Sequence, residues 1–368
     1  MIAFAPCQNY TEEACRSALE AVLELDWVKP GMRVGIKANL VHGAAPEKAA
    51  TTHPMLLRVL TEALQARGAS VVIGDSPGGL YNEAALNHVY RLCALEQTGA
   101  ELNRDFSLRQ VQFPEGRVLR SFTCTGWLDK CDAVINFSKL KAHGMMAMTG
   151  AVKNFFGAIP GTMKPEYHYR FPDPLDFAHM LVDLQEYYKP RLHLVDAVDC
   201  MEGNGPTAGT PRHMGLVLAG RDPYELDHVC ARLMGLEPSK VLTQAAALER
   251  GLVEDVPLPE ALEAYRLGDF KVPPTKSNIF KSVLPGKAGD LIGSAIGVLI
   301  APRPTLQAGC VGCGKCESMC PAKAIVMKNK KPHIRRRVCI GCFCCQEFCP
   351  KGALEAKRPA LARLLEKL

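Results

Sequence analysis

Eight cysteines near the end of the chain fall into two copies of one spacing pattern. The copies are CVGCGKCESMCPAKAI, which begins at Cys310, and CIGCFCCQEFCPKGAL, which begins at Cys339; each contains C-x2-C-x2-C-x3-C-P. In this pattern three closely spaced thiolates hold one iron-sulfur cubane, and the fourth ligates the other. A zinc site uses C-x2-C pairs but has no need for a tandem four-cysteine repeat followed by proline. The spacing therefore predicts two [4Fe-4S] clusters.

This segment resembles the bacterial two-cluster ferredoxins, and the resemblance implies a crossed set of ligands. It assigns to one cluster Cys310, Cys313, Cys316 and Cys349, and to the other Cys339, Cys342, Cys345 and Cys320. Cys344 does not fit the pattern, and we expect a buried thiol or one that lies close to a cluster. The remaining cysteines lack ligand spacing, so we interpret them as small buried hydrophobic residues.

The cluster segment carries many more Lys and Arg than Asp and Glu, most visibly in IVMKNKKPHIRRRV between the two repeats. Positive charge beside a cluster favours its reduced form and suits docking of an acidic electron carrier, a ferredoxin or flavodoxin. Solvated surface charge that balances the cluster anions is the alternative. Both interpretations remain open from the sequence.

A second group of chemically active residues lies in NFSKLKAHGMMAMTGAVKNFFGAIPG, residues 136–161. On an extended strand Lys139, Lys141 and His143 share one face, and Lys153 and Asn154 follow among glycines. No carboxylate lies within this stretch, so its cations and close-approach glycines fit a bound phosphate or carboxylate. Lysines that merely solvate a loop are the alternative. We take His143, Lys153 and Lys141 as candidate catalytic residues, and Lys139 and Asn154 as candidate anion- or cofactor-binding residues.

The elements that must position these residues alternate between strands and helices. MRVGIKANLV, ASVVIGDSPGG, CDAVINFSKLKAH and PRLHLVDAVDCMEGNGP read as strands, and HPMLLRVLTEALQARG reads as a helix. This pattern predicts an α/β fold with mainly parallel sheets and flanking helices, in one unit or as two α/β lobes. Ligands of such sheets bind outside the carboxyl ends of the strands. The strand ends add these candidate anion- or cofactor-binding residues: Lys37, Asn39, Asp75, Ser76, Asp196, Asp199 and Glu202.

Composition shifts divide the chain into four parts. Residues 1–270 form the predicted α/β main body with a candidate anion or cofactor cleft, and residues 271–308 form a Pro- and Gly-rich connector. Residues 309–357 form a small α+β ferredoxin-like domain with two clusters, and residues 358–368 form a tail helix.

Bulk properties exclude several classes of protein. The formal charge of +6 falls to about +2 once two oxidised clusters, each about −2 with its thiolates, are counted, so nothing indicates nucleic-acid binding. The N-terminus lacks the basic region of a signal peptide, and LIGSAIGVLIAP is too short for a transmembrane segment. Crowded cysteines in an enzyme-sized chain indicate metal sites in a reducing compartment, and we expect the cytoplasm.

Three motifs together resemble the iron-sulfur family called domain of unknown function 362: Lys-x-Asn after the first strong strand, the K-x-K-x-H…TGAVKNFFGAIPG block, and DAVDCMEGNGPTAGTPR ahead of a terminal ferredoxin module. The likeness covers nearly the whole chain and implies a redox-linked role in anaerobic or facultative metabolism. The segment from His143 to Gly161 is also similar to the histidine and glycine-lysine region of nickel-pincer lactate racemases. That similarity suggests a cleft site using His143 and Lys153, without the nickel cofactor or the racemase activity.

The sequence is compatible with three functions. The first is a ferredoxin-linked oxidoreductase that relays electrons through the clusters to an anionic substrate, or to an additional unidentified cofactor, in the α/β domain. The second is an electron-transfer subunit or adaptor that docks a partner redox enzyme and has no small-molecule site of its own. The third is a non-redox enzyme with structural clusters.

Overall fold

The computed structural model describes residues 2–275 and 301–359. Most of the predicted connector, 276–300, and most of the predicted tail helix, 360–368, lie outside the described residues.

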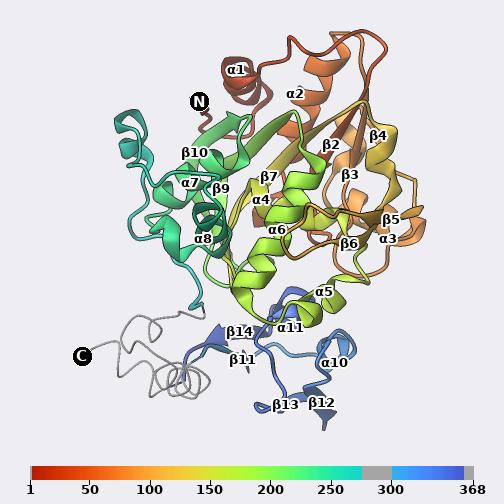
Figure 1. The fold of residues 1–368 in the computed structure, drawn as a ribbon, viewed down its shortest axis with the longest axis vertical. Coiled ribbons are helices and arrows are strands. Elements are labelled where there is room, and N and C mark those ends of the chain that lie inside the picture. The colour runs from red at the N-terminus through yellow and green to blue at the C-terminus, as the bar shows by residue number, and fades with distance from the viewer. Residues whose placement is uncertain (1, 276–300, 360–368) are drawn as a thin grey trace.

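One large sheet forms the centre of the fold (Figure 1). Its strand order is β1-β10-β9-β7-β2-β3-β4, and the short β8 pairs with β7. The strands are β1 (Ala3–Pro6), β2 (Arg33–Ala38), β3 (Ser70–Gly74), β4 (Glu101–Leu102), β7 (Ala133–His143), β8 (Ala147–Thr149), β9 (Leu192–Glu202) and β10 (Thr210–Gly220). The five strands from β9 to β4 run parallel. At one edge β10 pairs antiparallel with β9, and β1 pairs antiparallel with β10. The mainly parallel α/β prediction is confirmed, and the described residues form one such sheet, not two lobes.

Helices cover both faces of this sheet. One core cluster joins the sheet to α1 (Glu12–Val22), α2 (Pro54–Gln65) and α3 (Glu83–Leu92). The opposite side carries α4 (Ala151–Asn154), α6 (Pro174–Tyr188), α7 (Pro223–Leu233) and α8 (Leu242–Glu249), with the β5 (Leu108–Gln112) and β6 (Ser121–Thr125) hairpin and α5 (Lys164–Arg170). Apolar side chains at helical spacing make each helix bury one stripe against the strands.

The small C-terminal part lies below the main body in Figure 1. It contains β11 (Arg303–Leu306), α10 (Lys315–Ser318), β12 (Ile325–Lys328), β13 (Lys331–Ile334), α11 (Cys344–Glu347) and β14 (Leu354–Lys357). Strand β11 pairs with β14, and β12 pairs with β13 in a hairpin. Each cysteine repeat contributes one short helix, so the tandem sequence is matched by a repeated local structure.

Candidate active site

The carboxyl ends of β2 and β3 place a buried ion pair beneath the site. The Nζ atom of Lys37 lies 2.7 Å from Oδ1 of Asp75, and both side chains are almost fully buried. Asp75 also accepts hydrogen bonds from the backbone N–H groups of Leu40 and Ser76, each at 2.8 Å. Burial lowers the pKa of Lys37, although the Asp75 charge opposes this. A paired and hydrogen-bonded charge of this kind forms a rigid floor.

Amide side chains extend this floor toward β7 and α4. Asn39 donates to Oδ1 of Asn154 at 2.8 Å, and Asn154 donates to Oδ1 of Asn136 at 2.7 Å. The Lys141 ammonium donates to Oδ1 of Asn39 and to the carbonyl of Ala50, both at 2.6 Å. Burial, followed by the charge of a neighbouring lysine, holds the pKa of Lys141 well below its usual value. The sequence-predicted residues Asn39, Lys141 and Asn154 therefore form one connected network.

Lys139 belongs to a different group. It lies opposite Asp196 in the β7–β9 register, and their Nζ and Oδ2 atoms are 2.9 Å apart in a buried ion pair. The Lys139 ammonium also donates to the Tyr10 hydroxyl at 2.7 Å. Because Asp196 and Tyr10 occupy it, this lysine is not available to bind an external anion.

Asp199 and Glu202 are also separate from the amide network. Asp199 lies 2.8 Å from Nδ1 of His213 on an exposed part of β9 and β10, and Glu202 accepts from the backbone of Lys271 at 3.2 Å. Ser76 is buried, and its hydroxyl accepts from the N–H of Gly161 at 2.8 Å. These three residues hold loops together in the structure.

His143 connects the end of β7 to the C-terminal part of the chain. Its Nδ1 atom accepts from the backbone N–H groups of Met145 and Met146, which leaves the ring proton on Nε2. That Nε2 atom lies 2.7 Å from Oε1 of Glu347 in α11. Burial, with help from the Lys153 charge, lowers the pKa of His143 to about 4. Burial alone would raise the pKa of Glu347, but the charge of Lys153 and the His143 ring hold it far below its usual value.

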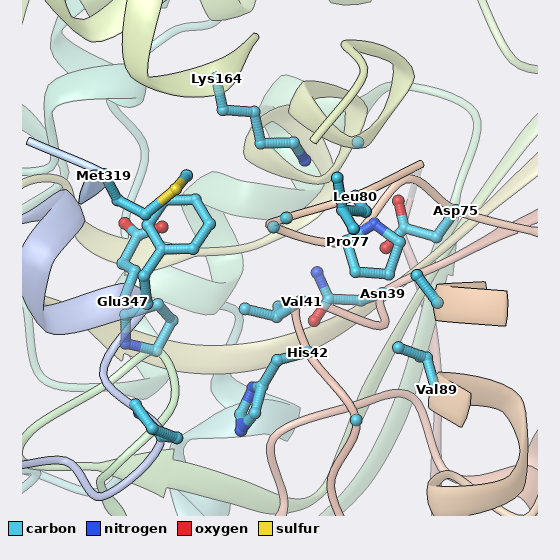
Figure 2. A pocket seen from close by; sticks show the side chains of 18 of the residues that line it. Asn39, Val41, His42, Asp75, Pro77, Leu80, Val89, Lys164, Met319 and Glu347 are labelled. Atoms are coloured by element: carbon cyan, nitrogen blue, oxygen red, sulfur yellow. The ribbon is translucent and has the colours of Figure 1, made fainter. Parts of the chain in front are cut away.

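A cavity of about 570 Å³ opens above the network, between the strand ends and the C-terminal part (Figure 2). Of the sequence-predicted residues, Asn39, Asp75, Lys153 and Asn154 from the main body line it, together with the predicted cluster ligand Cys349. In Figure 2, Asn39 and Asp75 come from the strand ends, Lys164 extends toward the cavity from another side, and Glu347 and Met319 form the wall contributed by the C-terminal part. The C-terminal wall contains Lys315, Ser318, Met319, Glu347, Phe348, Cys349 and Pro350.

Three lysines line the cavity without a carboxylate partner among the described residues: Lys315 in the C-terminal wall, and Lys153 and Lys164 in the main body. Lys153 makes neither a hydrogen bond nor an ion pair through its side chain there, and its Nζ lies 6.0 Å from the ring centre of Phe156. Lys164 donates to the carbonyl of Ser76 at 2.6 Å, and its Nζ lies 5.1 Å from the same ring centre. Burial lowers the pKa of Lys164 to about 8; Lys37 and Lys153 act in the same direction, whereas Asp75 and Glu347 oppose them.

Sequence reasoning missed Lys164, Thr149 and Glu347. Lys164 follows the glycine-rich block by three residues, so a wider window around that block would have included it. Glu347 stands between two predicted cluster ligands, where nothing local indicates a contact with His143. His168, the next histidine along the chain, is buried and stacked on Phe177, with ring centres 4.2 Å apart, and it does not line the cavity.

The eight repeat cysteines gather around two small cavities. Cys310, Cys313, Cys316 and Cys349 line one. Cys320, Cys339, Cys342 and Cys345 line the other, together with Cys344, which lies outside the ligand pattern. This grouping is the crossed arrangement implied by the ferredoxin resemblance. Four thiols around a small enclosed space are the donor set that a [4Fe-4S] cluster takes, so these residues fit the group. When bound, a cluster supplies one-electron transfer; this chain supplies its ligands and the surrounding charge.

The other cysteines follow the expected pattern. All sixteen lie among the described residues and none forms a disulfide. Cys344 is buried, and of the seven outside the repeats all are buried except the half-buried Cys131. Their burial agrees with the interpretation of these thiols as small hydrophobic residues, apart from Cys131.

The fold and the cysteine repeats define an α/β protein with a ferredoxin-type iron-sulfur module. Residues 309–353 match the 4Fe-4S dicluster domain family. Residues 34–232, more than half of the chain, match the family described as domain of unknown function (DUF362). The chain belongs to the DUF362 family. A thylakoid-associated protein of Synechocystis sp. is 33% identical to it over 258 residues, which cover 67% of this chain and 78% of that protein.

The lactate racemase apoprotein of Thermoanaerobacterium thermosaccharolyticum is a structural match. It aligns with a TM-score of 0.42 and 12% identity, over 65% of this chain and 57% of the racemase. The chain thus spans less than two thirds of the racemase. No activity is carried over from it. No helix in residues 2–275 or 301–359 is long and apolar enough to cross a membrane.

Proposed function

We propose that this protein is an oxidoreductase in which two [4Fe-4S] clusters relay electrons to an anionic substrate or cofactor bound in the cavity. We also propose that the main body ends at residue 270, the connector at residue 308 and the cluster domain at residue 357. The α/β main body provides the floor and cations of the site, and the cluster domain provides the facing wall.

The position of Cys349 is the observation that carries the proposal. Cys349 belongs to the cysteine group of one cluster and also lines the large cavity that contains Lys153, Asn154 and Asp75. A cluster held by this cysteine would border a ligand in the cavity, without an intervening layer of protein. An adaptor that only docks a partner enzyme has no use for such a cavity, so the cavity favours the oxidoreductase over the adaptor.

The roles of the candidate residues differ in this proposal. Lys153 contacts the anion, because it lines the cavity and forms no ion pair with a carboxylate of the described residues. Lys141 and His143 act as positioning residues: Lys141 fixes Asn39, and His143 holds Glu347 in the opposite wall. Lys37 and Asp75 anchor the floor.

The other cysteine group is the proposed electron-accepting end. The segment from Cys320 to Cys339 carries these exposed cations: Lys323, Lys328, Lys330, Lys331, Arg335, Arg336 and Arg337. Residues 301–359 contain three glutamates against twelve Lys and Arg. This charge supports docking of an acidic ferredoxin or flavodoxin. Sixteen unpaired cysteines support a reducing compartment, and we propose the cytoplasm.

Anaerobic purification followed by mass spectrometry of the released small molecules tests the proposal. We expect about eight irons per chain, as two cubane clusters require, together with a phosphorylated or carboxylated compound. Lys153→Ala should keep the iron and lose the compound, whereas Lys240→Ala, an exposed lysine outside the cavity, should keep both. Full iron with no bound or bindable anion in the wild-type protein would contradict the proposal and favour the adaptor.

A further inference from the structure

We infer that the cavity binds an organic anion with two distinct parts: a phosphate or carboxylate held by Thr149, Lys153 and Lys164, and an apolar body of ring size held by α3. This inference rests on the proposed function, since it names the class of ligand that would take the electrons.

Two donors at the polar end of the cavity, Thr149 and Lys153, have no acceptor among the described residues. The Thr149 hydroxyl is buried, with 2% of the residue exposed, and has no hydrogen-bond partner within the described residues. Lys153 stands four residues later and is equally unpartnered, and Lys164 faces the same Phe156 ring. A buried hydroxyl without a partner is costly, and a ligand oxygen placed here would satisfy it.

The two carboxylates that line the cavity, Asp75 and Glu347, each contact another side chain of the protein. Asp75 is paired with Lys37 and accepts two backbone N–H groups. Glu347 faces His143. Neither forms an ion pair with Lys153 or Lys164 among the described residues. The Glu347 charge offsets part of theirs from a longer distance, and the positive charge that remains at this end is directed to a ligand anion.

The other end of the cavity is apolar. Leu80, Leu86, Val89 and Leu92 line it from α3 and the loop before α3. Leu80 is 66% exposed and Leu92 is 42% exposed, which places both among the few large hydrophobic side chains left open to solvent. Exposed apolar side chains gathered at the rim of a cavity are typical of a ligand-binding site.

The volume of the cavity favours a larger ligand over a small inorganic ion or a short-chain acid. A cavity of about 570 Å³ lies within the roughly 300–1,000 Å³ range of sites that bury drug-sized molecules. An anion at Lys153 and Lys164 would leave the α3 side empty unless the same molecule continued across it. The geometry therefore favours a ligand that spans both ends.

Binding of simple probes to the oxidised, cluster-loaded protein tests this inference. The probes are 1-naphthyl phosphate and 1-naphthoate, which have both parts; 1-naphthol, which lacks the anion; and inorganic phosphate and acetate, which lack the apolar body. Calorimetry should give dissociation constants at least tenfold lower for a naphthyl anion than for naphthol, phosphate or acetate. Preference between the two naphthyl anions distinguishes an organic phosphate from a carboxylate.

Single substitutions test which residues bind the anionic part of the ligand and which bind its apolar part. Lys153→Ala and Lys164→Ala should weaken naphthyl-anion binding about tenfold or more and leave naphthol unchanged, with Lys240→Ala as the control. Leu80→Asn and Leu92→Asn should weaken all naphthyl probes, and Leu108→Asn, which is 54% exposed on β5 away from the cavity, should not.

Two results would overturn the inference: naphthol binding as tightly as the naphthyl anions, or inorganic phosphate binding as tightly as naphthyl phosphate. Because this assay involves no electron transfer, such a result would leave the proposed function standing if another anion still reoxidises the reduced clusters.

Discussion

The Nε2 atom of His143, at the end of the central strand β7, lies 2.7 Å from Oε1 of Glu347, which stands between two cysteines of the cluster repeat. This contact joins the cluster-bearing helix α11 to the end of β7. Gln346, also in α11, adds a second contact with the main body by donating to the carbonyl of Gly205 at 3.1 Å. The cluster domain is thus part of the cavity wall.

Removing this contact should loosen the wall. Glu347→Ala removes the carboxylate that lies 2.7 Å from the buried Nε2 of His143. This leaves that nitrogen without a polar neighbour, and we expect a loss of about 2–3 kcal/mol in the free energy of unfolding. Thermal unfolding of the cluster-loaded protein measures it. Glu355→Ala, which removes a half-exposed pair with Lys357, is the control and should cost about 0–1 kcal/mol. Equal effects of the two changes would contradict the role given to Glu347.

The assignment of the cluster ligands predicts the iron content of two cysteine variants. Cys349→Ser should lose the cluster next to the cavity and retain about four of eight irons, because one ligand of one cubane is removed. Cys344→Ser, a buried thiol outside the ligand pattern, should retain all eight. Iron and sulfide quantitation on anaerobically purified protein distinguishes them. If Cys344→Ser lost a cluster and Cys349→Ser did not, the ligand assignment would be wrong.

Gly157 lies against the buried floor. A Cβ atom at this position would meet Oδ1 of Asp75 and the ammonium group of Lys37. Gly157→Ala should therefore destabilise the protein by about 1–3 kcal/mol, the usual cost of overpacking. Gly268→Ala, where a Cβ would meet nothing within 4 Å, is the matched control in denaturant unfolding. An unchanged midpoint for Gly157→Ala would argue against a rigid Lys37–Asp75 floor.

Anion binding should depend on pH through Lys164. Burial lowers its pKa to about 8, and only the protonated ammonium attracts an anion, so affinity should be retained below pH 8 and fall as the pH rises through it. Calorimetric titration with 1-naphthoate, which stays ionised across this range, measures the effect. Lys164→Arg keeps its charge to higher pH and should flatten the profile. A profile that is the same in both proteins would remove Lys164 from the anion site.

Much of this site was predicted from the sequence by the rule that ligands bind outside the carboxyl ends of parallel strands. Asn39, Asp75, Lys153 and Asn154 were predicted from their places after apolar strands and in the glycine-rich block, and all four line the cavity. The same rule included Lys139 and Asp196, which do lie together but neutralise each other. A strand pattern reports which face a residue occupies, and it does not report which partner that residue meets.

Residues that reach the cavity from distant segments could not be predicted in this way. Glu347 is about two hundred residues from His143 along the chain, and only the packing of α11 against β7 brings them together. Lys164 reaches the site because α5 begins beside the Ser76 carbonyl. Such contacts depend on tertiary packing, and a single sequence carries no periodic signal for them.

Reoxidation of reduced clusters tests the central claim most directly. The protein is reduced anaerobically with dithionite, freed of reductant, and mixed with the small-molecule fraction released from native protein while cluster absorbance is followed. We predict rapid reoxidation in the wild type and in Lys240→Ala, and at least a tenfold slower reaction in Lys153→Ala with its cluster spectrum intact. Equal rates in Lys153→Ala and wild type, or clusters that stay reduced with every bound anion, would contradict the claim that the cavity ligand receives the electrons.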